Sequence, residues 1–108
     1  MKQVTLFRHG KAEPHGNGIE DFQRQLVKTG VESVTEVAKK AVEAWGSPDL
    51  VVSSPAVRAL ATAELFAEEL TTAEDIQLFE ELYAADSGDI LDVIRQLPAD
   101  TDYVVIVG

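Results

Sequence analysis

Two apolar segments of the chain end in residues that could act on an anion. The segment VTLF, near the N-terminus, is followed by Arg8, His9 and Gly10. The segment LVVS, near the middle of the chain, is followed by Ser54 and then by Arg58. Guanidinium groups match the geometry of phosphate oxygens, and a neutral imidazole is a nucleophile toward phosphorus. The pattern therefore predicts an oxyanion site that contains a histidine.

Each of these groups would have its own task in such a site. Gly10 would let the backbone approach the anion closely, and a helix starting after Ser54 would present free N–H groups to it. Neighbouring arginines favour the neutral form of His9, and a hydrogen bond from its Nδ1–H to a backbone carbonyl would direct Nε2 at the phosphorus. Arg8 and Arg58 would neutralise charge in the transition state. The scheme uses no cofactor and no metal, and no carboxylates have the spacing of a magnesium site.

Strand patterns recur at four places, and helical patterns fill the intervals between them. The strands are expected at residues 4–7, 50–53, 76–79 and 103–107. This alternation predicts an α/β fold, a three-layer sandwich with a mostly parallel sheet and right-handed crossovers. In parallel sheets ligands bind at the carboxyl ends of the strands. Both segments that carry the candidate residues end at that edge.

Three helices are expected between the strands. Thr29 is expected to cap the first, with Glu32 completing a capping box, and Ser54 is expected to cap the second. The third is expected to begin at Asp86 or Ser87. Apolar side chains at helical spacing should face the core, and they are Val31, Val34, Ala38, Ala41, Val42 and Trp45 in the first helix, Val57, Leu60, Ala61, Leu65 and Phe66 in the second, and Ile90, Leu91, Ile94 and Leu97 in the third.

Composition restricts the classes of function that this chain could have. Its 108 residues include 19 acidic and 9 basic side chains, for a formal net charge of −10. Nucleic-acid binding is not expected, because a basic face is needed to displace counterions from phosphates. No apolar stretch approaches the length of a membrane span, so no membrane association is expected. The chain has no cysteine, which fits a reducing cytoplasm.

Three segments taken together resemble the histidine phosphatase superfamily, and among its members the small phosphohistidine phosphatases of the SixA type. They are TLFRHGKAE, DFQRQLVKTG and VVSSPAVRALATAELF, in this order and spacing. The resemblance covers nearly the whole chain and implies a phosphoglycerate mutase-like fold. It implies that His9 is the nucleophile that becomes phosphorylated, and that Arg8 and Arg58 bind the phosphate. It also implies that Arg24 is a further basic residue near the substrate.

The general acid that would protonate the leaving group is harder to assign. Related enzymes often place one after the third strand, where this chain reads LFEELYAADSGD. Glu81 is the candidate, with Glu80 as the alternative, although both could be surface charges. A phosphohistidine substrate needs little help, because imidazole leaves more readily than an alkoxide. His15, in the Gly-rich loop, is expected to be solvated.

Members of the family continue past the last strand into a second histidine that completes the phosphate pocket. This chain ends at Gly108, before that position. We therefore expect residues 1–108 to form one histidine phosphatase domain that lacks its C-terminal part. A degraded family member is the alternative. In either case we expect weak activity and an uncovered sheet surface that invites self-association.

Three functions are compatible with these residues. The first is a metal-independent phosphatase that hydrolyses protein phosphohistidine through phosphorylated His9, so that its partner would be a phosphorylated protein. The second is the same chemistry on a small phosphorylated metabolite. The third is a non-catalytic module that binds phosphoanions through Arg8, His9 and Arg58. The sequence gives no indication of oligomeric state.

Overall fold

A four-stranded parallel sheet forms the centre of the computed structural model, which describes residues 3–16, 18–70 and 76–108. The strands are β1 (Gln3–Phe7), β2 (Leu50–Ser53), β3 (Ile76–Leu78) and β4 (Tyr103–Val107), in the spatial order β1-β4-β2-β3. All three strand pairs are parallel. The predicted strands are thus confirmed, with the third ending one residue early. No helix in the described ranges is long and apolar enough to cross a membrane.

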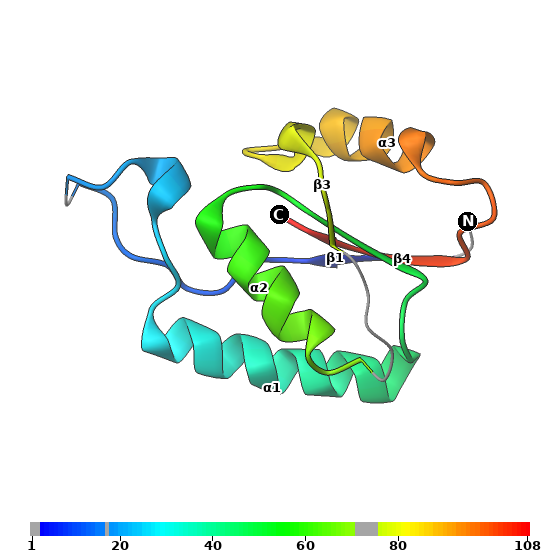
Figure 1. The fold of residues 1–108 in the computed structure, drawn as a ribbon, viewed down its shortest axis with the longest axis horizontal. Coiled ribbons are helices and arrows are strands. Elements are labelled where there is room, and N and C mark those ends of the chain that lie inside the picture. The colour runs from blue at the N-terminus through cyan, green and yellow to red at the C-terminus, as the bar shows by residue number, and fades with distance from the viewer. Residues whose placement is uncertain (1–2, 17, 71–75) are drawn as a thin grey trace.

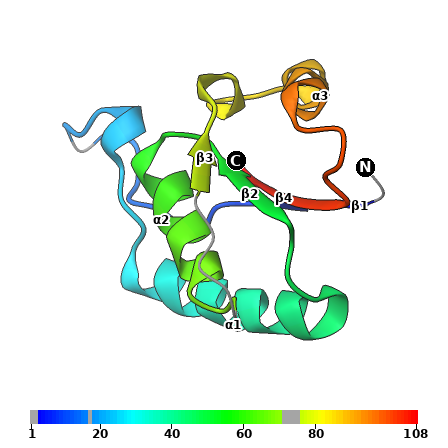
Figure 2. The same ribbon diagram turned by 45° about the vertical axis from the view of Figure 1, so that its right-hand side comes forward.

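Helices cover both faces of this sheet (Figure 1, Figure 2). Helices α1 (Lys28–Trp45) and α2 (Val57–Ala67) lie on one face, and α3 (Ser87–Gln96) lies on the other. Two short 3-10 helices, η1 (Asp21–Gln23) and η2 (Glu80–Leu82), precede α1 and α3 respectively. The three-layer α/β architecture predicted from the alternation of patterns is therefore confirmed.

The pleat of the two inner strands divides the core into two clusters, because successive side chains point to opposite faces. On the face that α1 and α2 cover, Val51, Val105 and Val107 pack against small residues of both helices, such as Ala38 and Ala63. On the α3 side, the inner strands contribute Leu50, Val52, Val104 and Ile106, which pack with Leu82, Val93 and Leu97. The two inner strands are thus buried on both sides, as their continuous apolar sequences indicate.

Two of the three helices begin later or earlier than predicted. The cap of α1 is Val27, two residues before the predicted Thr29, and no side chain caps the helix. The amide of Val27 instead donates to the carbonyl of Lys11, so a tertiary contact sets the entry into the helix. Helix α2 starts after Ala56, because the amide of Ser54 still bonds to Val107 in the sheet. The predicted start of α3 is confirmed, since Asp86 forms a capping box.

Several predicted core side chains are exposed. Leu91 is 51% exposed, whereas Val93 is fully buried in the core cluster between α3 and the sheet. Successive helix positions differ by about 100° in direction, so the buried face of α3 excludes Leu91. In α1, Trp45 and Val31 are 57% and 37% exposed, whereas Val34 is buried. These side chains lie at the edges of the apolar faces that the helical spacing predicted.

Strand β1 lies at an edge of the sheet and is covered on one face only. Its residue Phe7 is buried on the face that α1 and α2 cover. Val4 and Leu6, which pair in register with Val104 and Ile106, are 37% and 61% exposed on the α3 side. The apolar segment VTLF is therefore not buried on this face. The prediction of an uncovered sheet surface is confirmed.

Candidate active site

The carboxyl edge of the sheet brings together residues that are far apart in sequence. The amide of His9, just beyond β1, donates to the carbonyl of Gly108 over 3.1 Å. The amide of Ser54, just beyond β2, donates to the carbonyl of Val107 over 2.9 Å. Because β4 lies between β1 and β2, the two candidate segments flank its end. They border a pocket of 490 Å³.

His9 is held in one orientation by its two ring nitrogens. The Nδ1 atom lies 2.8 Å from the carbonyl oxygen of Gly10. Since a carbonyl only accepts, Nδ1 carries the proton and Nε2 carries the lone pair. The Nε–H of Arg58 donates to this lone pair over 3.3 Å. The predicted hydrogen bond from Nδ1 to a backbone carbonyl is confirmed, and Nε2 is the atom that faces the cation.

The guanidinium of Arg58 is fixed by contacts on all three nitrogens. Besides the bond to His9, its Nη1 donates to the carbonyl of Asp21 over 2.6 Å and its Nη2 to Asp21 Oδ2 over 3.1 Å. Its Cζ lies 5.9 Å from the centre of the Tyr83 ring, within the range of a cation–π contact. The Arg58 side chain is only 10% exposed, yet it lines the pocket. A buried, directed cation at this place can bind an oxyanion.

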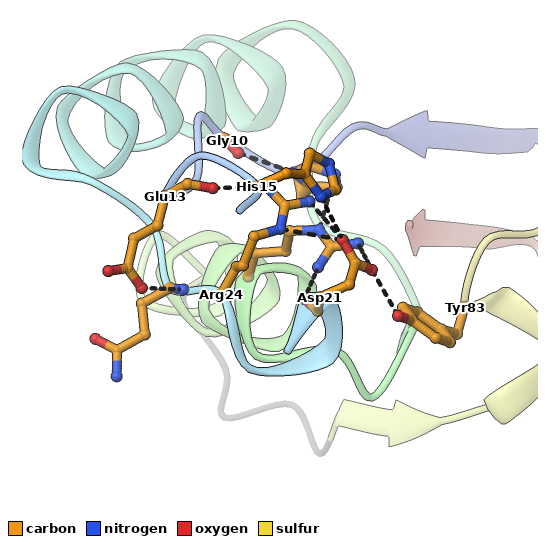
Figure 3. Close-up of polar contacts among 9 residues, drawn as sticks. Gly10, Glu13, His15, Asp21, Arg24 and Tyr83 are labelled. Atoms are coloured by element: carbon orange, nitrogen blue, oxygen red, sulfur yellow. Dashed lines mark hydrogen bonds and ion pairs between the residues drawn. The ribbon is translucent and has the colours of Figure 1, made fainter. Parts of the chain in front are cut away.

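Asp21 connects this site to the loop before α1 (Figure 3). Its Oδ1 accepts from Nε and Nη2 of Arg24 over 3.0 and 2.8 Å, and its Oδ2 accepts from Arg58 and from the hydroxyl of Tyr83. The Tyr83 hydrogen bond, followed by those from the arginines, holds the pKa of Asp21 well below its usual range. In turn, the hydrogen bond to Asp21 raises the pKa of Tyr83.

Sequence reasoning missed Asp21, Tyr83 and Thr62. Buried Thr62 accepts from the amide of Gly10 over 3.1 Å and donates to the carbonyl of Arg58 over 2.8 Å. It therefore ties the loop after β1 to α2. The spacing held some signal, because Thr62 stands four residues after Arg58 and shares its helix face. Tyr83 carried no such signal, since it approaches from the segment after β3.

The role expected for Gly10 is not the one that the geometry shows. Gly10 does not line the pocket. A Cβ atom placed on it would lie 2.6 Å from Val34 Cγ2 and 3.0 Å from the carbonyl oxygen of Gly30. The absence of a side chain is thus needed for the loop to pack against α1. Its carbonyl orients His9, which is its direct contribution to the site.

Arg24 also differs from the prediction. It is buried, does not line the pocket, and uses its guanidinium within the loop. Besides its two bonds to Asp21, it donates from Nη1 to the carbonyl of Glu13 over 2.6 Å. The geometry therefore does not support contact between Arg24 and a substrate. Arg24 supports Asp21 instead.

The proposed general acid lies outside the pocket. Glu81 is exposed, and its Oε2 accepts from Gln96 Nε2 over 2.9 Å. This hydrogen bond lowers the pKa of Glu81, which is the wrong direction for a proton donor. Glu80 is also exposed and absent from the pocket lining. The prediction that Glu81 or Glu80 protonates a leaving group thus lacks geometric support.

The remaining candidates lie where the sequence predicted them. Arg8 and Ser54 both line the pocket. The Oγ of Ser54 accepts from the amide of Ala56 over 3.2 Å. The side chain of His15 is 76% exposed, as expected, and its Nδ1 lies 3.5 Å from Asp21 Oδ1. Across residues 3–16, 18–70 and 76–108, no group of three or more His, Cys, Asp or Glu side chains is placed to hold a metal ion.

Comparison with known proteins identifies the family. Residues 4–100 match the Histidine phosphatase superfamily (branch 1). The chain belongs to this superfamily. None of the curated proteins compared with the chain matches it.

Solved structures agree with this assignment. The candidate phosphohistidine phosphatase SixA from Agrobacterium tumefaciens is 31% identical, with a TM-score of 0.87 over 97% of this chain and 67% of that one. A protein histidine phosphatase SixA complexed with tungstate is 22% identical, with a TM-score of 0.83 over 97% and 67% of the two chains. A phosphoglycerate mutase from Plasmodium falciparum shares the fold, at 14% identity and a TM-score of 0.65 over 97% and 60%. The predicted phosphoglycerate mutase-like fold is thus confirmed. The chain spans 57% to 67% of the SixA chains that it matches.

Proposed function

We propose that this histidine phosphatase superfamily chain acts as a metal-independent phosphatase through a phosphorylated His9. The observation that carries the proposal is the arrangement of His9, whose Nδ1 is bonded to Gly10 O and whose Nε2 faces Arg58. In the first step the Nε2 lone pair forms a bond to phosphorus, and the bond from phosphorus to the leaving group breaks. In the second step water attacks phosphorus, which releases phosphate and restores the imidazole.

Arg58 and Arg8 would supply the positive charge that this transfer needs. Charge builds on the equatorial oxygens of the phosphoryl group, and directed guanidinium groups stabilise it. The Nε–H of Arg58 is hydrogen-bonded to Nε2 of His9, and Arg8 lines the same pocket. Substrate binding would move the Nε–H of Arg58 from the lone pair of His9 to a phosphoryl oxygen.

Protein phosphohistidine is the substrate class that we propose. Among the described residues that line the pocket there is no Asp or Glu, so no carboxyl group is in place to protonate an alkoxide. Imidazole is a better leaving group than an alkoxide and needs such help least. The likeness to SixA proteins supports the same substrate. A phosphorylated protein would then be the partner, and a cytoplasmic location remains a prediction from the cysteine-free sequence.

The test is to trap the phosphorylated chain. We expect a protein phosphorylated on histidine to transfer its phosphoryl group to wild-type chain, which gives an acid-labile, base-stable adduct. His9→Ala should abolish the adduct, and His15→Ala should retain it, since these are the two histidines of the chain. A clear preference for sugar phosphates would overturn the substrate class. Binding of orthovanadate without any adduct would identify a phosphoanion-binding module instead.

A further inference from the structure

We propose that Asp21 is a positioning residue that sets the guanidinium of Arg58 against His9, with Tyr83 as its second support. This inference rests on the proposed function, because it concerns the same site. Asp21 does not line the pocket, so it would act through Arg58 rather than on a substrate. Its carbonyl and its Oδ2 receive separate N–H groups from Nη1 and Nη2 of Arg58.

Two contacts to one residue determine the direction of a planar group. With Nη1 and Nη2 both bonded to Asp21, the guanidinium plane is fixed, and its Nε–H points at Nε2 of His9. Each terminal nitrogen carries two N–H groups, so Asp21 leaves one on each for an oxyanion. A guanidinium without this support would have to be ordered at the moment of binding, at a cost in side-chain entropy.

Asp21 can do this because the loop that carries it is itself fixed. Arg24 bonds to Asp21 Oδ1 through two nitrogens and to the carbonyl of Glu13 through the third. Glu13 and Gln25 are joined by two further hydrogen bonds, from the amide of Glu13 to the carbonyl of Gln25 and from the amide of Gln25 to Glu13 Oε1. These bonds join residue 13 to residues 24 and 25 at the base of the loop before α1, as Figure 3 shows for Glu13 and Arg24.

Tyr83 supports the same carboxylate from the opposite side. It follows η2, which is far from the loop in sequence, and its hydroxyl donates to Asp21 Oδ2. Its ring meets that of Phe22 edge to face, with centroids 5.4 Å apart at an angle of 79°. The segment after β3 and the loop before α1 thus meet at Asp21, and Arg58 lies between them. The low pKa of Asp21 keeps its carboxylate charged when solution becomes mildly acidic.

The experiment measures phosphoryl transfer to His9 and orthovanadate affinity in the 108-residue chain. Asp21→Asn keeps the shape of the side chain and removes its charge. We expect it to slow adduct formation by about 10- to 100-fold, the usual effect of a displaced reacting group. Tyr83→Phe removes one hydrogen bond to the carboxylate and should slow it by about fivefold. The matched control is Asp92→Asn, which removes the exposed ion pair of 3.4 Å to Arg95 and should leave the rate unchanged.

A double-mutant cycle separates positioning from a general structural role. If Asp21 acts through Arg58, then Asp21→Asn should add little to the loss already caused by Arg58→Lys. Fully multiplicative losses would overturn the inference, and so would an Asp21→Asn chain that is less stable but transfers normally. If wild-type chain forms no adduct, the proposed function fails. Orthovanadate affinity then decides the inference alone, because Asp21→Asn must weaken it and Asp92→Asn must not.

Discussion

Arg58 donates its Nε–H to Nε2 of His9 over 3.3 Å, although the two residues are 49 positions apart. The proposed nucleophilic atom is therefore hydrogen-bonded to the guanidinium group. The contact is possible because β4 places the ends of β1 and β2 on its two sides, and α2 begins soon after β2, at Val57. Any change that separates the two groups should affect phosphoryl transfer first.

Arg58→Lys should slow the formation of phosphorylated His9 by about 10²- to 10³-fold, the usual cost of removing one group directed at a transition state. Lysine keeps the charge, but its ammonium cannot reach His9 and both acceptors of Asp21 in one plane. Rapid-quench measurement of the adduct tests this. The control is Arg95→Lys, which changes an exposed arginine of α3. A wild-type rate in Arg58→Lys would contradict the role of the planar guanidinium group.

Thr62→Val should lower the free energy of unfolding by about 1–3 kcal/mol, because it removes the acceptor of the Gly10 N–H in a partly buried contact. The shape of the side chain is retained, but the amide of Gly10 loses the hydroxyl that it donates to. Urea denaturation measures the change. Thr62→Ser keeps the hydroxyl and should lose much less stability. Equal losses in the two variants would show that packing of the methyl group, and not the hydrogen bond, matters here.

Gly30→Ala should destabilise the fold by about 1–3 kcal/mol, the usual cost of overpacking. Helix propensity alone predicts the opposite, a gain of about 1 kcal/mol for alanine inside a helix. A Cβ atom on Gly30 would lie 2.2 Å from the carbonyl oxygen of Lys11, and backbone cannot move aside as a side chain can. Thermal unfolding of Gly30→Ala, compared with Ser33→Ala at an exposed position of α1, gives the sign of the change in stability. A stabilised Gly30→Ala chain would refute the close approach.

The hydroxyl of Tyr83 should titrate above its ordinary value of 10.0, because it donates to Asp21, is partly buried, and would place a second negative charge beside that carboxylate. Since the pKa is raised in the folded chain, this contact contributes stability below pH 10 and loses it as the pH rises further. Tyrosinate absorbance in Tyr103→Phe, which leaves Tyr83 as the single tyrosine, measures the value. Adding Asp21→Asn should bring it back toward 10.0, and an unchanged titration would contradict the coupling.

The open face of β1 should promote self-association as the concentration of the chain rises. Leu6 is 61% exposed beside Val4 on this edge strand, and edge strands with apolar faces invite pairing with another chain. Leu6→Gln combined with Val4→Thr should lower the mass measured by sedimentation equilibrium. The control is Leu91→Gln, which changes a leucine of similar exposure on α3. If that control has the same effect, the β1 face is not the contact surface.

The sequence predicted the fold well because the relevant signals are local. Runs such as YVVIV favour strands wherever they stand, and the alternation of strands and helices permits few topologies. The parallel arrangement then places His9 and Ser54 at one edge without further information. The predicted helix caps at Thr29 and Ser54 were wrong, because hydrogen bonds from the amides of Val27 and Ser54 to distant carbonyls determine where these helices start.

The sequence by itself therefore determined the alternating elements and the shared edge of the sheet, and it predicted that His9 and Arg58 belong to one site. Only the tertiary structure decided that Arg24 and Glu81 do not line the pocket, and that Asp21 accepts hydrogen bonds from both Arg58 and Tyr83. The physical reason is that strand and helix patterns repeat over a few residues. Contacts between the loop before α1 and the segment after β3 instead depend on where the whole chain places each side chain.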